Sequence, residues 1–159
     1  MQEAAQHDTT PEKPPALWPL PGFHGKARVA TIFGDLPIEA LRRRDELKTR
    51  AGPYLRVEWV DKIHLDDGFL RSCPDANPVL ITANALRRGL PARPMMLSPD
   101  QALFLPEPGM QTRARPARDL AKARHGISRW PVSGITYFVF HCGKPAEVSV
   151  EGIWCATAP

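Results

Sequence analysis

The sequence has few residues that could cross-link the chain or hold a metal ion. Its three cysteines are Cys73, Cys142 and Cys155, and their wide, unequal spacing matches neither a disulfide framework nor a set of zinc ligands. The histidines form no H-x-H or H-x-x-x-H pair of the kind that binds metal. We therefore expect isolated thiols in a reducing compartment, no metal site and no cofactor.

The chain also lacks a segment for the membrane or for export. No apolar run approaches the roughly 18 residues that a membrane-spanning helix requires. The N-terminal sequence, MQEAAQHDTTPEKPP, has no basic start followed by an apolar core, which a secretory signal would have. These absences predict a cytoplasmic protein with no membrane partner, although export by a route without such a signal stays open.

The excess of positive charge is small. The formal net charge is +4 and the sequence pI is near 9.2, with arginines gathered at 42–44, 87–88 and 113–118. Such clusters can bind an anionic surface, but no aromatic residues interleave with them and no nucleic-acid-binding signature is present. We interpret them as a solvated basic face and expect an unknown protein partner before nucleic acid. The candidate binding residues are Arg42, Arg43, Arg44, Arg87 and Arg88.

Proline, by contrast, is abundant, with 18 residues spread along the chain. Because proline interrupts helices and interior strands, this distribution favours short strands, turns and extended connections. Residues 1–21 are polar and then proline-rich, which predicts a flexible N-terminal arm that Leu17–Leu20 could anchor to the domain. Residues 22–159 are expected to form one domain, since this length suits a single hydrophobic core.

The rest of the chain consists of short apolar segments separated by turns. Those rich in β-branched and aromatic residues predict strands at 27–32, 55–63, 79–82, 102–105, 136–140 and 147–150. Helical signals are short, at 37–42, 67–71 and 117–124, with Asp67 expected to cap the second. Ser98 and Pro99 mark a helix start or a tight turn. We therefore predict an all-β domain of many short strands with a few short helical turns.

The stretch from Gly22 to Leu47, GFHGKARVATIFGDLPIEALRRRDEL, resembles the opening block of bacterial Hint (hedgehog/intein) domains, C-F-x-x-G-T-x-I-x-T-x-x-G-x-x-P-V-E-x-L-x-x-G-D. Residues 78–105, with PVLITANAL, GLPAR and LSP, are similar to the family's P-V-R-I-x-A-G-A-L-G-x-G-x-P-x-R-D-L-x-L-S-P-x-H-R-L-L. Shorter similar blocks occur at 55–62, 115–120 and 135–152. Together the five blocks follow the family's order over nearly all of residues 22–154.

The resemblance implies a Hint-like all-β horseshoe built from two pseudo-symmetric halves, and a self-processing chemistry for which this chain lacks the residues. In active relatives the first cysteine attacks the preceding carbonyl carbon. A histidine of L-S-P-x-H protonates the departing amide nitrogen, and a late histidine supports later steps. The matching positions here are Gly22, Gln101 and Pro145. They supply no nucleophile, no titrating proton and no polar side-chain group, respectively.

Few other residues could substitute for them. His24 is the one candidate nucleophile between residues 21 and 31, since imidazole can accept an acyl group. Cys142 follows His141, which could activate a thiol, but neighbouring side chains on a strand face opposite ways. Cys155 lies where splicing inteins carry their last nucleophile, yet the preceding His-Asn pair of those inteins is missing here.

Three functions are compatible with these residues. The first is a Hint-like domain without autoproteolytic activity that acts as a binding or structural module. The second is a self-processing domain that uses His24 or another non-standard nucleophile. The third is a basic protein that binds nucleic acid or another anionic partner. Losing general-acid assistance alone would slow self-cleavage by about 10²–10⁴, whereas losing the nucleophile removes the covalent route. The first function is therefore preferred.

Overall fold

The structure is a computed structural model that describes residues 16–106 and 113–159. These residues form short strands joined by turns, with two short α-helices and two 3-10 turns. The elements are β1 (Phe23–His24), β2 (Arg28–Thr31), β3 (Gly34–Pro37), η2 (Ile38–Ala40), β4 (Glu46–Leu47), β5 (Leu55–Arg56), β6 (Trp59–Leu65), α1 (Asp67–Ser72), η3 (Pro74–Ala76), β7 (Val79–Ile81), β8 (Met95–Leu97), β9 (Ala102–Leu103), β10 (Arg115–Pro116), α2 (Ala117–Ala123), β11 (Ile127–Arg129), β12 (Ile135–His141), β13 (Ala146–Val150) and β14 (Ile153–Thr157). The predicted all-β class is confirmed.

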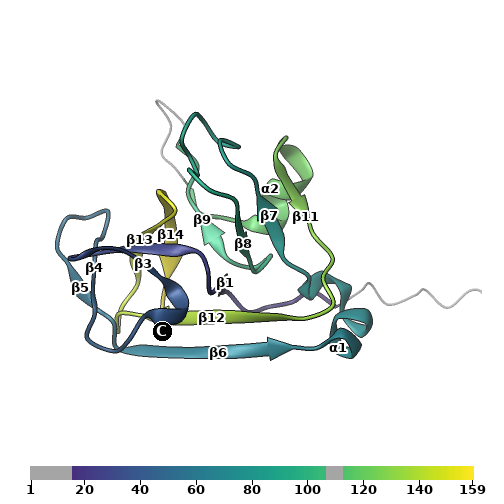
Figure 1. The fold of residues 1–159 in the computed structure, drawn as a ribbon, viewed down its shortest axis with the longest axis horizontal. Coiled ribbons are helices and arrows are strands. Elements are labelled where there is room, and N and C mark those ends of the chain that lie inside the picture. The colour runs from purple at the N-terminus through teal and green to yellow at the C-terminus, as the bar shows by residue number, and fades with distance from the viewer. Residues whose placement is uncertain (1–15, 107–112) are drawn as a thin grey trace, which may run out of the picture.

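Two antiparallel sheets make up the body of the molecule. The first has the order β11-β7-β8-β1-β12-β6, and the second has the order β10-β9-β14-β13-β2-β4-β5, with β3 paired to β2. The pair β6 and β12, in register from Ile135 opposite Leu65 to His141 opposite Trp59, runs along the length of the molecule (Figure 1). Strands β7, β8 and β11 rise from one end of this pair with α2, and the β2–β5 region lies at the other end (Figure 1). Strand β1 lies between β8 and β12 in the first sheet, so the start of the domain is held at its centre.

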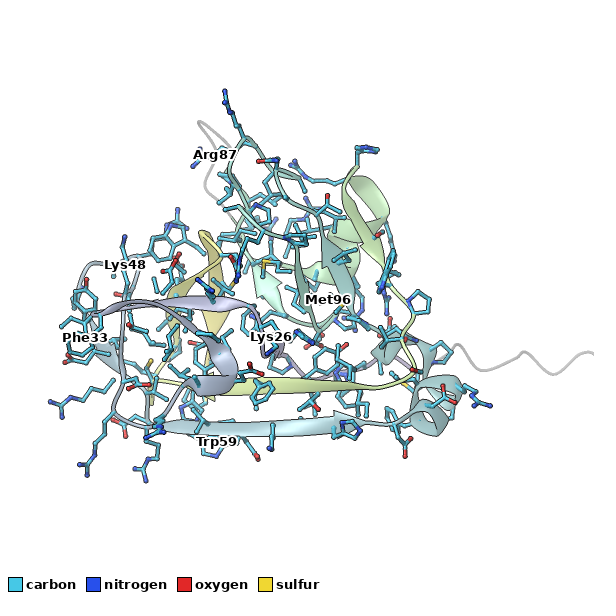
Figure 2. All side chains as sticks on the ribbon, in the orientation of Figure 1. Lys26, Phe33, Lys48, Trp59, Arg87 and Met96 are labelled. Atoms are coloured by element: carbon cyan, nitrogen blue, oxygen red, sulfur yellow. The ribbon has the colours of Figure 1, made fainter. Side chains whose placement is uncertain are left out.

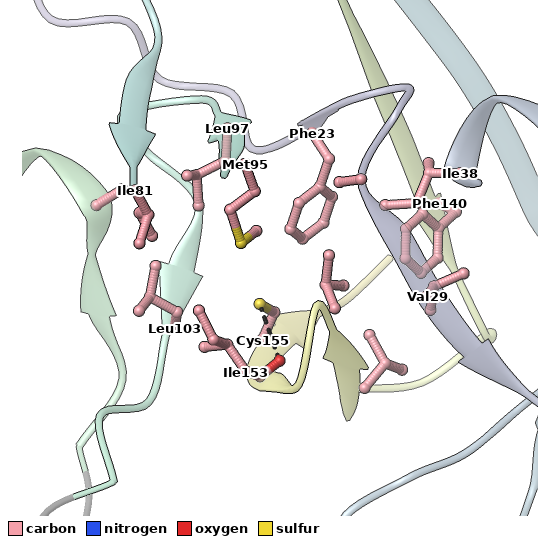
Figure 3. Packing of buried hydrophobic residues seen from close by; sticks show 14 of the residues in the cluster. Phe23, Val29, Ile38, Ile81, Met95, Leu97, Leu103, Phe140, Ile153 and Cys155 are labelled. Carbon is pink, nitrogen blue, oxygen red and sulfur yellow. Dashed lines mark hydrogen bonds between the residues drawn. The ribbon is translucent and has the colours of Figure 1, made fainter. Parts of the chain in front are cut away.

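The main hydrophobic core draws side chains from both sheets. Phe23, Ile81 and Leu97 come from the first sheet, and Val29 and Cys155 come from the second. Their side chains converge in Figure 3, and each is almost fully buried. Because β1 contributes Phe23 to this core, the neighbouring Gly22 has a fixed place in the fold.

A second, smaller cluster fixes the end of the N-terminal arm. Trp18 is only 8% exposed and packs with Leu65, Leu70, Ile135 and Tyr137. Residues 16–21 are therefore attached to the domain surface through this tryptophan, which agrees with the anchor expected at Leu17–Leu20. The rest of the predicted flexible arm lies outside the described residues.

The strand predicted over residues 55–63 is wrong as a single element. Strand β5 ends at Arg56 in the second sheet, and β6 begins at Trp59 in the first. Between them, the Val57 N–H bonds to the Asp45 carbonyl and the Glu58 N–H bonds to the His141 carbonyl. The chain thus changes sheets here, and an apolar pattern alone does not show such a change.

The predicted cap of the first helix is also corrected by one residue. Asp66, not Asp67, is the N-cap of α1, and its carboxylate accepts a hydrogen bond of 2.8 Å from the Phe69 N–H. Asp67 is the first helical residue and pairs with Arg71. The Ser98 signal proves to be a tight turn, closed by the Gln101 N–H on the Ser98 carbonyl at 3.0 Å.

The remaining helical predictions are confirmed, with η2 inside 37–42 and α2 over most of 117–124. In the described part of the chain, the longest helix has seven residues, which is too short to span a membrane.

Candidate functional site

The chain enters the domain along an extended segment that is hydrogen-bonded at every second residue. The Trp18 N–H donates to Asp75 at 2.7 Å, and the Trp18 carbonyl accepts from Arg118 at 2.7 Å. The Leu20 carbonyl accepts from the Ser98 hydroxyl at 2.6 Å. At Gly22 the carbonyl accepts from the Ser98 N–H at 2.9 Å. Both sides of the Pro21–Gly22 peptide bond are therefore held against the body of the protein.

Gln101 completes this arrangement at the Gly22 nitrogen. Its Oε1 accepts a hydrogen bond of 3.1 Å from the Gly22 N–H. Its Nε2 donates to the carbonyls of Ala156 at 2.8 Å and Ala102 at 3.0 Å. The side chain is buried, with the residue 2% exposed. The Gln101 amide therefore joins the start of the domain, at Gly22, to the last strand, β14, at Ala156.

The backbone at Gly22 has a conformation that other residues rarely adopt. Its φ angle is +147°, and a β-carbon built there would lie 3.0 Å from Cβ of Tyr137 and 3.2 Å from Cγ1 of Val139. A φ angle in this range is strained for any L-amino acid. The close contacts leave little space for a side chain. Position 22 is thus shaped around glycine in both conformation and packing.

The upstream segment depends on a partly buried network of charges. Asp75 accepts hydrogen bonds from Arg118 at 2.8 Å and Arg129 at 2.9 Å, and Arg118 also bonds to Asp100 at 3.0 Å. Burial by itself raises the pKa of Asp75. The hydrogen bonds from Arg118, the Trp18 N–H and Arg129 outweigh burial and hold that pKa below its usual value. Asp75 is therefore an anion that helps to fix the arm.

A pocket of about 430 Å³ opens beside Gly22. We call it the Gly22 pocket; it lies between the arm, β6, β12 and the end of β14. Its walls are mostly apolar. The two polar groups of note on its lining have partners within the protein: the Gln101 amide is hydrogen-bonded and the Asp100 carboxylate is paired with Arg118. The lining residues include Leu20, Pro21, Gly22, Trp59, Val139, Gln101 and Ala158.

None of the three thiols lines this pocket. Cys155 is fully buried between β13 and β9, and its Sγ donates to the Ile153 carbonyl. Burial raises the pKa of the Cys155 thiol well above its usual value. Burial, with the nearby Glu58 carboxylate, also raises the pKa of Cys142. A thiol with a raised pKa is protonated and therefore a poor nucleophile.

The other candidate nucleophile, His24, lines a different pocket. Its Nδ1 accepts a hydrogen bond from the Lys26 N–H at 3.3 Å. His141 stacks on Trp59, with ring centroids 5.3 Å apart, and its Nδ1 accepts from the Gly143 N–H at 3.0 Å. The His141 ring therefore has two partners other than the Cys142 thiol.

Of the three positions that match the family's chemical residues, the structure brings two together. Gly22 and Gln101 are hydrogen-bonded, as described above. Pro145 lies in the loop before β13 and lines another pocket, with Thr49 and Pro53. The arginines at 42–44 and at 87–88 are exposed, the first group after η2 and the second in the turn after β7, and neither group lines the Gly22 pocket.

Sequence reasoning missed the residues that hold the upstream segment. The sequence predicts only a helix start or a tight turn at Ser98, although its hydroxyl and N–H bind on both sides of Pro21. Arg118 was assigned to a solvated basic face, but its side chain is 11% exposed and bonded to two aspartates. No local sequence pattern groups Asp75 with Arg118 and Arg129.

In the described residues, no set of three or more potential metal ligands occurs.

Comparison with known proteins gives one family and a set of similar folds. The model of a family described as the Hint domain matches residues 21–158. The structure is similar to that of a DnaB intein from Synechocystis sp. PCC 6803, with a TM-score of 0.57 and 10% identity over 88% of this chain and 100% of that one. It is also similar to the gp41-1 intein, with a TM-score of 0.52 and 12% identity over 86% and 98% of the two chains.

The Ssp DnaB mini-intein variant M86 gives a TM-score of 0.53 and 10% identity over 91% of this chain and 99% of that one. No curated protein matches the chain. At these identities the structural similarities show a shared fold and say nothing about shared chemistry.

Proposed function

Because the chain belongs to the Hint domain family, we propose that it is a member that leaves its own backbone intact and serves as a binding or structural module. The family's self-processing reaction would break the Pro21–Gly22 peptide bond. It requires a nucleophile at position 22 and a proton for the departing nitrogen. The residues around that bond determine whether either requirement is met.

The direction of one hydrogen bond is the observation that carries the proposal. The Gly22 N–H donates to Gln101 Oε1, so the side chain offers the amide nitrogen a lone pair and not a proton. An amide side chain has no titrating proton to give at this position. Gln101 therefore supports the folded structure around an intact peptide bond.

Nearby hydroxyl and thiol groups do not replace the missing nucleophile. The Ser98 hydroxyl donates its hydrogen to the Leu20 carbonyl, which is not a base that could activate it. Cys142 and Cys155 are buried with raised pKa values, and His24 faces a separate pocket. These facts argue against the self-processing alternative.

The basic-binder alternative also receives little support. Arg118 and Arg129 are bonded to Asp75, and Arg93 is bonded to Glu151 at 2.9 Å. Part of the positive charge is thus neutralised within the molecule. The arginines at 42–44 and 87–88 lie on separate loops, which does not favour one continuous binding surface.

The Gly22 pocket suggests how the module could bind. Its apolar walls and its internally satisfied amide suit an uncharged apolar group, such as a hydrophobic side chain of a protein partner. Trp59, which is 43% exposed, forms part of the wall.

Two measurements on the full chain test these statements. Incubation with and without an added thiol should leave the intact mass at 17.7 kDa, and release of residues 1–21 would overturn the claim that the backbone stays intact.

For the pocket, the uncharged dye N-phenyl-1-naphthylamine should bind the wild type and bind Trp59→Ala more weakly. The matched control is Trp130→Ala, since Trp130 is 51% exposed and lies outside the pocket. Equal binding by both variants would contradict the role of the pocket.

A further inference from the structure

A second concave surface in the described part of the chain is lined by several basic side chains. We call it the His24 pocket; its volume is about 670 Å³. It is lined by His24, Lys26, Lys62 and His64, together with Glu39 and Thr136. These residues come from β1 and the turn after it, from β6, and from β12 and η2. Lys26 lies over β12 in Figure 2, and the pocket is distinct from the Gly22 pocket.

The charges in this pocket do not cancel. Glu39 is the single carboxylate among its lining residues, and it is paired with Lys26 at 2.8 Å. Asp61 is near in sequence, but its carboxylate accepts from the Lys62 backbone N–H at 2.7 Å and it does not line the pocket. Lys62 is an exposed residue and forms no ion pair with the other described residues. With neutral histidines, two lysines and one glutamate leave the pocket with an excess of one positive charge.

The two histidines add hydrogen-bond donors to this charge. Nδ1 of His24 accepts from the Lys26 N–H, which makes Nε2 the N–H donor of the neutral ring. Nδ1 of His64 bonds to the Thr136 hydroxyl at 2.9 Å, and when it accepts, its Nε2 is likewise the donor. Both rings are held in place by these bonds. The pocket thus combines separate N–H donors with a lysine that lacks an anionic partner.

We propose that the His24 pocket binds a phosphate monoester carried by a small organic molecule or by a lipid headgroup. Lysine acts on phosphate as a point charge, whereas bidentate recognition of a carboxylate favours arginine. The oxygens of a phosphate can accept from several separate donors. Lys62 and the two imidazoles supply such donors, and the Lys26 ammonium, which also pairs with Glu39, supplies another. The volume exceeds that of a bare phosphate ion and lies within the range of ligand pockets. Phe138, which also lines it and is partly buried, offers apolar contact to the ligand's organic part.

The test is an NMR titration of the full chain, with the ring signals of His24 and His64 as the readout. Glycerol 3-phosphate represents the soluble source, glycerol is its phosphate-free control, and phosphatidylcholine vesicles with and without phosphatidic acid represent the lipid source. Saturable shifts of both histidines with glycerol 3-phosphate, and none with glycerol, are the expected result. If only vesicles with phosphatidic acid bind, the proposal holds with the headgroup as the ligand.

Two lysine variants show whether the pocket itself is responsible. Lys62→Ala should weaken binding by about tenfold or more, because it removes a charge-assisted hydrogen bond. Lys48→Ala removes the same charge from an exposed position outside the pocket and should leave binding unchanged. Absence of any shift with either phosphate source, or an equal loss in both variants, would overturn the proposal. None of these outcomes depends on whether the backbone is cleaved.

Discussion

Gln101 and Gly22 are joined by a hydrogen bond of 3.1 Å from the glycine N–H to the side-chain oxygen. The same glutamine bonds through Nε2 to the Ala156 carbonyl in β14. One buried amide therefore links the residue just before β1 to the last strand, β14. This amide holds the residue that follows the Pro21–Gly22 bond in place.

Replacing Gln101 should reduce stability even when its volume is kept. Gln101→Ala and Gln101→Met both leave the buried Gly22 N–H and Ala156 carbonyl without a partner, and each orphaned group costs about 1–3 kcal/mol. We expect the free energy of unfolding in urea to fall by about 2–4 kcal/mol in both variants. A methionine variant as stable as the wild type would show that the hydrogen bonds contribute little.

Adding one methyl group at Gly22 should be more damaging than adding it at another glycine with positive φ. Gly22 has φ of +147° and a crowded β-carbon position, while Gly34 has φ of +103° and nothing within 4 Å. Both Gly22→Ala and Gly34→Ala carry backbone strain, and only Gly22→Ala adds close contacts with Tyr137 and Val139. We expect Gly22→Ala to lose about 1–3 kcal/mol more in urea unfolding. Equal losses would mean that Tyr137 and Val139 move aside easily.

Removing the Asp75 charge should change how the free energy of unfolding depends on pH in the acidic range. The pKa of Asp75 is lower in the folded protein than in the unfolded chain, where it is about 3.9. Its carboxylate therefore adds stability above that pH, and this contribution is lost as the pH falls through the lower folded value. Asp75→Asn should cost about 3 kcal/mol at neutral pH, and the difference from the wild type should shrink in acid.

The matched control for that experiment is Asp67→Asn. Asp67 forms an exposed pair with Arg71 in α1, and exposed pairs contribute at most about 1 kcal/mol. Thermal or urea unfolding measured across pH for the three proteins would separate the two effects. An Asp75→Asn profile parallel to that of the wild type would contradict the role assigned to the network.

The three thiols should differ in their reactivity toward Ellman's reagent. Cys73 is partly exposed, whereas Cys142 and Cys155 are buried and have raised pKa values. One thiol should react quickly in the folded protein and the other two only after denaturation, because the thiolate is the reacting form. Cys73→Ser should remove the fast phase. A fast phase of two or three thiols would mean that Cys142 or Cys155 is reactive in the folded protein and could act as a nucleophile.

The sequence allowed the central pair to be predicted but not its surroundings. Gly22 and Gln101 follow from their places in ordered blocks, since those blocks keep their positions in the fold. Pro145 matches the family's late histidine by its place in the last block. The structure places it in the loop before β13, where spacing constrains position weakly, and at another pocket. Strands β1, β4 and β10 have two residues each, which is too short for an alternating pattern to appear.

Charge pairs between residues far apart along the chain are the other feature that the sequence does not predict. Arg118 lies 43 residues from Asp75 along the chain, and its sequence neighbours suggested a solvated basic cluster. Only the fold shows that α2 and η3 bring the two residues together. The segment Leu17–Leu20 is predicted as an anchor, but the sequence does not indicate the backbone bonds of Trp18 to Asp75 and Arg118.

Treatment of the full chain with hydroxylamine, followed by intact mass measurement, tests the central claim most directly. Hydroxylamine attacks thioesters and esters, so it would trap an acyl transfer to any thiol or hydroxyl near Pro21. The sequence has no Asn-Gly bond that the reagent would cut, since Asn77 and Asn84 precede proline and alanine. We expect a single species of 17.7 kDa at all incubation times. A growing product that begins at Gly22 would contradict an intact backbone and a purely structural Gln101.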